Sequence, residues 1–363
     1  MSLGTKREGF EMGHRPREKF VFRKIAALGF AGAVALLPAC GAGDETSAED
    51  SVRVLVPAES PLEYPQRVAE SVGFFEEEGI TTTVSYTGGA SEVLQQLVGG
   101  QGDIGVSCSS AIVSGFEQGF DEIRPIFTQF YGSIYGLSVP GESSITDPAE
   151  LKGKTVGISD AAGGEVPIVK GILAESGLDE GDVELLPIGE GTAVALRAIQ
   201  KGDVDAIAGS FSDFVGLQVQ GQELTPIGGE TLDELPACSV VTTKAYAEDN
   251  PDLVEGFLRA SAKGVLWGQS HPEETLEILR DASPTGYEGQ LGEDMMDLYV
   301  PLMAPPEPDA IGDISAESYQ AYFEFVEAEE PEGLTDMITD EYIGPANEFD
   351  RSEVENAKNS NAN

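Results

Sequence analysis

Short apolar stretches alternate with longer amphipathic ones in the first third of the chain. Apolar residues fall mainly at alternate positions in residues 52–56 and again in the β-branched run 82–86, which predicts two strands. A helix running to Phe75 is predicted between them. Residues 92–98 place Val93, Leu94 and Leu97 on one helical face, and residues 103–106 form another short strand. This strand–helix order predicts an α/β fold with a mostly parallel sheet.

The pattern recurs at an offset of 102 residues. Apolar strand positions, glycine breakers and one acidic residue coincide at this offset. The matching pairs are Val54 with Val156, Val56 with Ile158, Gly79 with Gly181, Val84 with Leu186, Gly89 with Gly191, Leu94 with Leu196, Gly100 with Gly202 and Asp103 with Asp205. We therefore expect two similar lobes, which a chain of 363 residues is long enough to form.

The second copy begins in the stretch 151–173. Residues 155–159 predict a buried strand, 161–165 a small-residue turn, and Pro167 marks a helix start. A strand that leads through glycines into a helix leaves backbone N–H groups pointing above the strand end, where a ligand can bind. The alternative is an ordinary strand-to-helix turn.

The order of elements changes after Ser210. Residues 224–227 predict an edge strand and 238–243 a buried strand. Four helices are then expected, at 253–267, 273–279, 287–302 and 315–328. Residues 351–363 are polar, and we expect a disordered tail from residue 350.

The N-terminus has the features of an export signal. A basic segment precedes an apolar run, residues 25–37, which is too short to span a bilayer comfortably. The run ends in Leu37-Pro38-Ala39-Cys40, which resembles a bacterial lipoprotein signal that attaches lipid to Cys40. The alternatives are a simply cleaved signal and a buried helix. Residues 41–50 read as a flexible tether, and translation could begin at Met1 or Met12.

The chain is strongly acidic. Removal of residues 1–40 would take away 7 of the 21 basic and 3 of the 64 acidic residues and leave a net charge of −47. Nucleic acid is disfavoured as a partner because a phosphate-binding face needs Lys and Arg. An exported protein with such a surface would suit a salt-tolerant organism.

Five segments together resemble the solute-binding proteins of bacterial ABC importers. They are GFFEEEGI (73–80), LVGGQGDIGV (97–106), DPAELKGKTVGI (147–158), ALRAIQKGDVDAIAG (195–209) and EDNPDLVEGFLRASAKGVLW (248–267). The nearest group binds thiamine-pyrimidine precursors, aliphatic sulfonates or nitrate. The resemblance implies a type II periplasmic binding protein, with residues 51–137 plus 239–349 in lobe 1 and 138–238 in lobe 2. Two strands would connect the lobes, and closure over a ligand would present it to a permease with its ATPase.

The candidate ligand contacts lie in loops that the resemblance places at the carboxyl ends of strands, where α/β sheets bind ligands. They are Glu59, Tyr64, Gly89, Ser91, Ser107, Ser109, Gly164, Glu165, Thr192, Phe211 and Asp213. Each has a structural alternative: a surface aromatic for Tyr64, helix capping for the serines and glycines, and a helix cap for Asp213.

The charge of these loops favours one class of ligand. They carry Glu59, Glu63, Glu165, Glu190 and Asp213, without any Lys or Arg. A neutral or cationic ligand with N–H donors, such as an aminopyrimidine or another nitrogenous heterocycle, fits best, stacked on Tyr64, Tyr86 or Phe211. The alternative is an aliphatic sulfonate or nitrate-like anion held by helix N-termini.

Cysteine and histidine content bears on the remaining functions. With Cys40 lipidated, the resemblance places Cys108 beside Cys238, and export favours oxidation, so a disulfide and two free buried thiols are both open. The histidines are His14 and His271, and no metal-ligand set, nucleophile elbow or phosphate loop is present. We therefore expect neither an enzyme, such as a relative of the pyrimidine synthases, nor a cofactor. A sensor or adhesion module with the same cleft is the third alternative. A monomer anchored through lipid on the extracytoplasmic face is expected.

Overall fold

The computed structural model describes residues 50–359 except 59–60, 230, 233–234 and 306–308. All described residues belong to one compact unit of the chain, Ser47–Asn363. The predicted signal peptide, the lipid site Cys40 and the tether before Asp50 lie outside the described residues.

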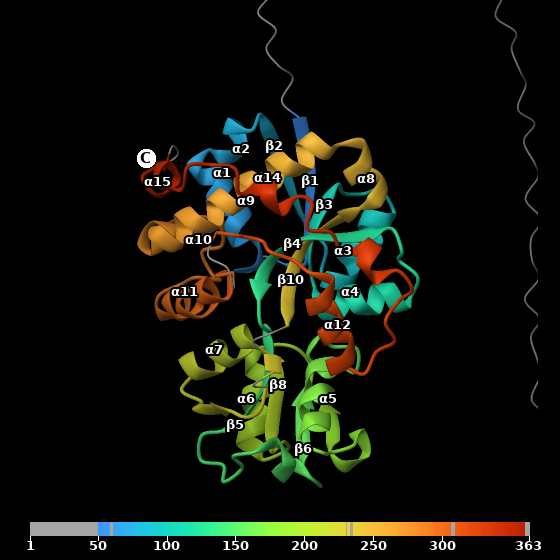
Figure 1. The fold of residues 1–363 in the computed structure, drawn as a ribbon. Helices are drawn as coiled ribbons and strands as arrows, with labels where there is room; N and C mark the ends of the chain where they lie inside the picture. Colours follow the sequence, from blue (N-terminus) through green and yellow to red (C-terminus); the bar gives the residue numbers. More distant parts are fainter. Residues whose placement is uncertain (1–49, 59–60, 230, 233–234, 306–308, 360–363) are drawn as a thin grey trace, which may run out of the picture. The chain divides into compact units, whose positions relative to one another are not determined.

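Two five-stranded sheets form the framework of this unit (Figure 1). Sheet A has the order β2-β1-β3-β10-β4, and sheet B the order β7-β6-β8-β5-β9. The strands of sheet A are β1 (Asp50–Val56), β2 (Ile80–Tyr86), β3 (Ile104–Cys108), β4 (Ile123–Tyr131) and β10 (Pro236–Thr243). Those of sheet B are β5 (Tyr135–Pro140), β6 (Thr155–Ile158), β7 (Glu184–Pro187), β8 (Ala206–Ser210) and β9 (Leu224–Pro226). The chain crosses between the sheets twice, from β4 to β5 and from β9 to β10.

Each sheet combines four strands of one direction with one reversed strand. Strand β1 pairs parallel with β2 and β3, and β6 pairs parallel with β7 and β8. The two strands that follow the crossings, β10 and β5, run antiparallel to both of their neighbours. The two-lobed α/β fold is therefore as expected, although the sheets are mixed rather than mostly parallel.

Helices pack on the sheets wherever the sequence offers an apolar stripe. Those following strands in the repeated units are α1 (Tyr64–Val72), α2 (Phe74–Glu77), α3 (Ala90–Val98), α4 (Ser109–Glu117), α5 (Glu165–Glu175), α6 (Thr192–Lys201) and α7 (Phe211–Val219). The C-terminal part contributes α8 (Lys244–Asp249), α9 (Pro251–Ser270), α10 (Pro272–Ala282), α11 (Gln290–Leu302), α12 (Ala316–Phe325), α13 (Leu334–Met337), α14 (Ile343–Ala346) and α15 (Arg351–Glu355). Short 3-10 turns occupy Pro61–Glu63, Pro148–Leu151 and Glu180–Asp182.

The offset of 102 residues is a structural repeat. Asp103 accepts the Arg53 backbone N–H at 2.8 Å, and Asp205 accepts the Thr155 N–H at 3.0 Å. The two acidic residues therefore hold the same place beside β1 and β6. Gly100 and Gly202 both adopt φ 69°, a left-handed conformation that glycine tolerates best.

The repeat slips by one residue at its second strand. Val54 pairs with Val84 in sheet A, but Val156 pairs with Leu185 in sheet B. The predicted match of Val84 with Leu186 is thus wrong by one position. Helix α6 nevertheless starts directly after Gly191, as α3 starts directly after Gly89. The offset of 102 residues is therefore restored before the helix begins.

The lobe boundaries differ from those predicted. A division between residues 137 and 138 would cut β5, whose residues all pair within sheet B. A division at 238/239 would likewise cut β10, which lies in sheet A. The first crossing is residues 132–134, between β4 and β5, and the second lies between the end of β9 at Pro226 and the start of β10 at Pro236.

The tail after residue 350 is not wholly disordered. Asp350 caps α15 by accepting the Ser352 N–H at 2.9 Å, and Val354 is buried. The indole N–H of Trp267 in α9 donates to the Ala357 carbonyl at 2.9 Å. A polar sequence therefore becomes ordered because it docks on α9.

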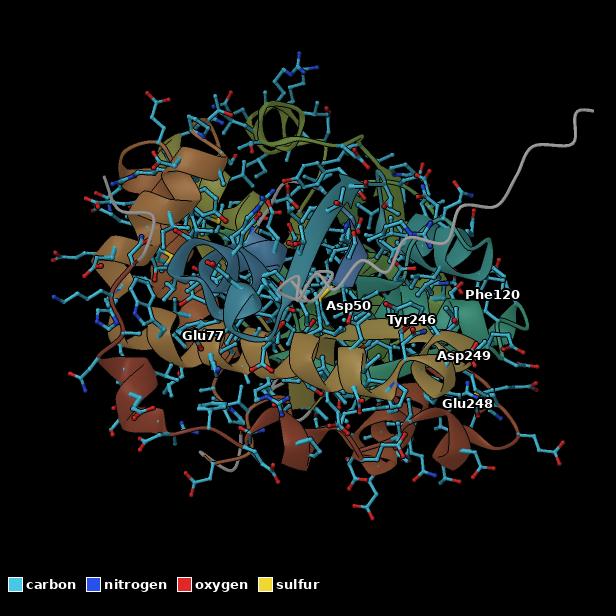
Figure 2. All side chains as sticks on the ribbon, turned by 90° about the horizontal axis from the view of Figure 1, so that it is seen from above. Asp50, Glu77, Phe120, Tyr246, Glu248 and Asp249 are labelled. Atoms are coloured by element: carbon cyan, nitrogen blue, oxygen red, sulfur yellow. A yellow bond between two sulfur atoms is a disulfide. The ribbon has the colours of Figure 1, made fainter. Side chains whose placement is uncertain are left out.

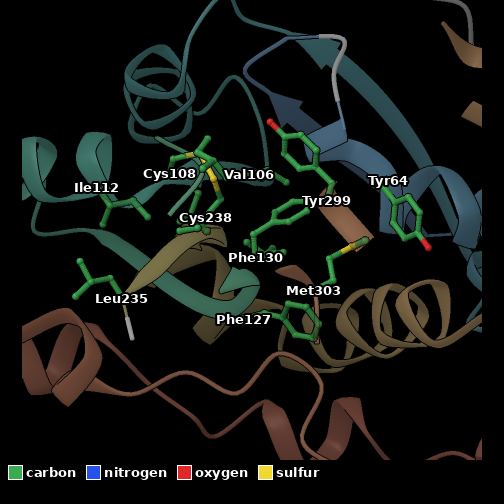
Figure 3. Close-up of a cluster of buried hydrophobic side chains, with 14 of the residues drawn as sticks. Tyr64, Val106, Cys108, Ile112, Phe127, Phe130, Leu235, Cys238, Tyr299 and Met303 are labelled. Carbon is green, nitrogen blue, oxygen red and sulfur yellow. A yellow bond between two sulfur atoms is a disulfide. The ribbon is translucent and has the colours of Figure 1, made fainter. Parts of the chain in front are cut away.

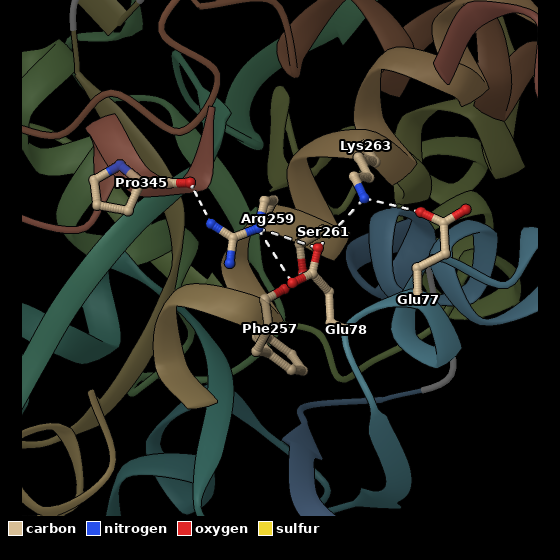
Figure 4. A network of polar contacts seen from close by, with 7 residues as sticks. All are labelled: Glu77, Glu78, Phe257, Arg259, Ser261, Lys263 and Pro345. Atoms are coloured by element: carbon tan, nitrogen blue, oxygen red, sulfur yellow. Dashed lines mark hydrogen bonds and ion pairs between the residues drawn. The ribbon is translucent and has the colours of Figure 1, made fainter. Parts of the chain in front are cut away.

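Helix α9 is the central helix of the sheet A half, and ion pairs fix it in place. Lys263 contacts Glu77 at 2.9 Å and Glu78 at 3.3 Å, while Arg259 contacts Glu78 at 3.1 Å and the Pro345 carbonyl at 2.8 Å (Figure 4). These pairs tie α9 to α2 and to α14.

The acidic residues lie mainly outside. In Figure 2, side chains with oxygen at their tips project around the rim, among them the exposed Glu77, Glu248 and Asp249. The negative charge therefore remains solvated.

Candidate functional site

Three helix N-termini define the candidate site. Helix α4 follows β3 in sheet A, while α5 follows β6 and α7 follows β8 in sheet B. Each begins at the carboxyl end of a parallel strand, where N–H groups point out of the helix. Helix α4 packs against α5, and α7 packs against α11 from the sheet A half. The N-termini of both halves therefore contribute to one region.

The carboxylate of Glu165 occupies the start of α5. It is 4% exposed and accepts the Ser159 N–H at 2.7 Å and the Ser159 hydroxyl at 2.6 Å. Both carboxylate oxygens lie against Gly163, where a Cβ would approach within 2.6 Å of Oε2. A side chain at position 163 would therefore have to displace the Glu165 carboxylate.

A second carboxylate occupies the start of α7. Asp213 accepts the Ser210 N–H at 3.0 Å and the Ser210 hydroxyl at 2.6 Å in a capping box. The neighbouring Phe211 packs over Gly136 of β5. Asp213 is therefore a helix cap in this structure, and capping leaves its charge directed toward the region between the halves.

Tyr135 connects these groups, and the sequence analysis missed it. Its ring lies on Gly164, where a Cβ would be 2.7 Å from Cζ. Burial raises the pKa of the Tyr135 hydroxyl, and the negative charge of Glu165 and then the groups Tyr299 and Asp213 raise it further. The phenol is therefore a neutral hydrogen-bond donor between two carboxylates. Its position as the first residue of β5, directly after the segment that crosses from sheet A to sheet B, is the signal that could have identified it.

Two serines near the start of α4 form hydrogen bonds to the backbone of the protein itself. Ser107 donates to the Ala90 carbonyl at 3.1 Å, and Ser109 donates to the Pro236 carbonyl at 2.6 Å; both are buried. Ser110 is half-buried. The predicted contacts Ser107 and Ser109 therefore fasten α3 and β10, whereas Ser110 lies nearer the region between the halves.

Several predicted contacts lie elsewhere. Tyr64 is 2% exposed and its ring is packed on Gly268 of α9, so it cannot stack on a ligand (Figure 3). Thr192 packs against Gly216 of α7. Gly89 and the exposed Ser91 begin α3 at the end of β2. Glu59 lies outside the described residues.

The predicted carboxylate cluster is partly neutralised. Glu63 is buried and pairs with Arg67 at 3.0 Å, and the Tyr86 hydroxyl donates to Glu63 at 3.0 Å. Arg67 in turn donates to the Tyr86 oxygen at 2.6 Å. By contrast, no ion pair among the described residues includes Glu165 or Asp213.

Cys108 and Cys238 form the expected disulfide (Figure 3). They are directly paired in the antiparallel ladder of β3 and β10. Cys108 is also the N-cap of α4. The bond therefore joins the start of α4 to the strand by which the chain returns to sheet A.

Two surface hollows lie on the sheet B half, away from this region. One, of about 540 Å³, is lined by Gly141, Gln218 and residues 221–225. The other, of about 450 Å³, lies between α6 and β7 and includes Arg197 and Lys201. Neither hollow includes Tyr135, Glu165 or Asp213. The candidate site is therefore defined by the helix N-termini and not by these hollows.

Within the described ranges, no group of three or more His, Cys, Asp and Glu residues is suited to hold a metal ion. Among the same residues, no helix combines the length and the apolar character needed to cross a membrane.

Comparison with known proteins identifies the family. The family model described as "NMT1/THI5 like" matches residues 64–275, more than half of the chain. The chain belongs to the NMT1/THI5-like family. A formylaminopyrimidine-binding protein of Halalkalibacterium halodurans is 22% identical over 271 residues, covering 72% of this chain and 79% of that protein.

Two further similarities are informative. A 4-amino-5-hydroxymethyl-2-methylpyrimidine phosphate synthase of Legionella pneumophila is 28% identical over 236 residues, covering 62% of this chain and 71% of that protein. The crystal structure of the periplasmic aliphatic sulphonate binding protein SsuA from Escherichia coli has a TM-score of 0.61 at 17% identity, covering 80% of this chain and 92% of that chain. The fold is therefore that of the periplasmic binding proteins.

Proposed function

We propose that this protein is the extracytoplasmic solute-binding subunit of an ABC importer. It captures a small nitrogenous heterocycle, of the aminopyrimidine class, between its two halves and delivers it to a permease with its ATPase. The observation that supports this most strongly is the meeting of the α5 and α7 termini at Tyr135, with α4 of the other half packed against α5. The similarity to a formylaminopyrimidine-binding protein supports the same class of ligand.

The chemistry of the site favours a ligand that donates hydrogen bonds. Two of the three helix N-termini already carry a carboxylate of the chain itself, Glu165 on α5 and Asp213 on α7. An anion placed beside them would be repelled, by about 4 kcal/mol for unit charges 4 Å apart at an effective dielectric constant of 20. Amino and protonated ring nitrogens would instead hydrogen bond these oxygens.

One observation favours the second candidate, binding of an aliphatic sulfonate. Helix α4 has no acidic residue in its first turn and no side-chain cap, so its N–H groups could hold an anion. The similarity in fold to a sulphonate binding protein is consistent with this alternative. Glu165 opposes it from the facing half.

We propose binding rather than catalysis. The two described cysteines are joined in a disulfide, and His271 is stacked on Trp267, at 4.4 Å between ring centroids. The residues gathered around Tyr135 offer carboxylates and hydroxyls, and the carboxylates are held by hydrogen bonds from Ser159 and Ser210. The similarity to a synthase makes turnover of any bound pyrimidine a necessary control.

Location and partners complete the proposal. Lipid on Cys40 would anchor the protein to the outer face of the cell membrane, with residues 41–49 as the tether. A Cys40→Ser variant should appear in the soluble fraction, whereas the natural protein should be extracted with detergent. Release of both proteins without detergent would refute the anchor.

Calorimetric titration tests the choice of ligand. We expect formylaminopyrimidine to bind and ethanesulfonate to give no heat. Glu165→Gln and Asp213→Asn should each weaken binding about 10- to 100-fold, because a hydrogen bond to a charged group is lost. Glu190→Gln, which changes an exposed carboxylate of a neighbouring loop, is the matched control and should bind normally. Tight sulfonate binding without a response to the amine would overturn the assignment.

A further inference from the structure

The ring of Tyr86 is exposed at the edge of sheet A from which α4 begins. Tyr86 is the last residue of β2 and pairs with Val56, the last residue of β1. It is 46% exposed, and no other aromatic side chain among the described residues reaches that exposure. Strands β1, β2 and β3 run parallel, so Tyr86 lies at the same carboxyl edge as the start of α4, two strand spacings or about 10 Å to the side. An exposed aromatic ring therefore borders the candidate site in the sheet A half.

A closed set of hydrogen bonds holds this ring in place. The Tyr86 hydroxyl donates to Glu63 Oε1 at 3.0 Å and accepts from Arg67 Nη2 at 2.6 Å. Arg67 Nε also pairs with Glu63 Oε2 at 3.0 Å, and Glu63 is 3% exposed. Because a buried carboxylate needs its partners, the three groups hold one another in position. Strand β2 therefore fixes one end of the Tyr86 side chain, and the start of α1 fixes the other.

The other two aromatic residues expected to stack on a ligand are covered by the protein itself. Tyr64 is 2% exposed. Phe211 packs over Gly136, and its ring centroid lies 6.3 Å from that of Phe214. A ring that served packing alone would be buried like these. A ring that is both fixed and exposed, as in Tyr86, can stack on a ligand with little further loss of conformational freedom.

We propose that Tyr86 is the stacking platform for the planar ring of the solute. The face of a tyrosine ring carries partial negative charge, so it attracts an electron-poor or protonated heterocycle. Arg67 neutralises the charge of Glu63, so Glu165 and Asp213 of the sheet B half remain the acceptors for amino groups. The sheet A half thus contributes the ring contact and the sheet B half the hydrogen bonds. This inference rests on the proposed function, since it names how the same ligand is held.

Titration of the full chain with 2-aminopurine and with formylaminopyrimidine tests the platform. 2-Aminopurine is an amino heterocycle whose fluorescence is quenched when it stacks on an aromatic ring. We expect quenching by the natural protein, whereas Tyr86→Leu should abolish it and weaken binding of both probes about 5- to 100-fold, as for the loss of one base–aromatic stack. Tyr86→Phe keeps the ring without its anchor and should weaken binding only about 2- to 5-fold. Val98→Ala, which trims another exposed apolar side chain of the same half, is the matched control and should bind normally.

Tyr86→Thr also removes the ring and suits an edge strand, so it keeps the test decisive if Tyr86→Leu does not fold. Weaker binding by Glu165→Gln, with undiminished binding by the variants without the ring, would overturn the platform and leave the proposed function standing. The reverse result would support the platform and overturn the assigned acceptors. If the natural protein binds neither probe, or if all of these variants bind as it does, the platform and the proposed ligand site are both refuted.

Discussion

The disulfide should contribute a large share of the stability of the folded chain. Cys108 and Cys238 are 130 residues apart in sequence, and the loop that they close includes every strand of sheet B. A covalent link restricts the unfolded chain. The entropy of the unfolded chain changes by about −2.1 − 1.5R ln n cal/mol/K for a loop of n residues. For this loop the bond is expected to add about 5 kcal/mol to the free energy of unfolding at 25 °C. Net stabilities of globular domains are only about 5–15 kcal/mol.

Urea unfolding of the oxidised and the fully reduced protein measures this contribution. Trp267, the single tryptophan, is fully buried, so its fluorescence reports unfolding of the sheet A half. We expect a lower midpoint after reduction and a larger dependence of the unfolding free energy on urea, because the reduced unfolded chain is more expanded. The Cys108→Ala, Cys238→Ala double variant is the control, since reductant cannot affect its midpoint through this bond. A loss below about 1 kcal/mol on reduction would refute the loop-entropy reasoning.

Three further perturbations test the packing. Gly171→Ala should destabilise by about 1–3 kcal/mol in thermal denaturation, because its Cβ would lie 2.6 Å from Phe325 Cζ; an unchanged melting temperature would show that α5 and α12 do not pack so closely. Removing residues 350–363 takes away the Ala357 carbonyl that Trp267 hydrogen bonds, so tryptophan emission should shift to longer wavelength, and an unchanged spectrum would contradict docking of the tail. Burial opposes ionisation of Asp205, but the backbone N–H and the lysine that contact it prevail and lower its pKa. The Asp205 carboxylate therefore stabilises the folded chain above its unfolded pKa of about 3.9, and this stabilisation is lost as the pH falls through the lower pKa of the folded state. Asp205→Asn should reduce the pH dependence of the melting temperature below about pH 4. An identical pH profile of the variant and the natural protein would refute this.

The elements that a local pattern specifies were predictable from the sequence. Glycine breakers and apolar stripes repeat with the same spacing, so the fold class and the positions of α3 and α6 followed directly. The one-residue slip at β7 did not follow, because β7 is an edge strand without a fully buried residue, so burial specifies its pairing register only weakly. The docked α15 was missed because its order depends on contacts with α9, far away in the sequence.

The candidate site was predictable only in part. The predicted loops after strands do lead into helices, and Glu165 and Asp213 lie where helices begin in sheet B. Tyr64 was misassigned because an aromatic residue near a strand end can turn into the core as readily as into a cleft. Tyr135 could not be found from loop motifs, since it follows the segment that crosses between the sheets. Its place beside Glu165 and Asp213 arises only when the elements of sheet B are assembled.

Native mass spectrometry of the protein purified from its own host tests the central claim most directly. The account predicts a one-to-one complex whose released ligand is a small nitrogen heterocycle with amino hydrogens, and predicts that Glu165→Gln is recovered without it. Recovery of a sulfonate in the natural protein, or of the same heterocycle bound equally well by Glu165→Gln, would contradict the proposed site.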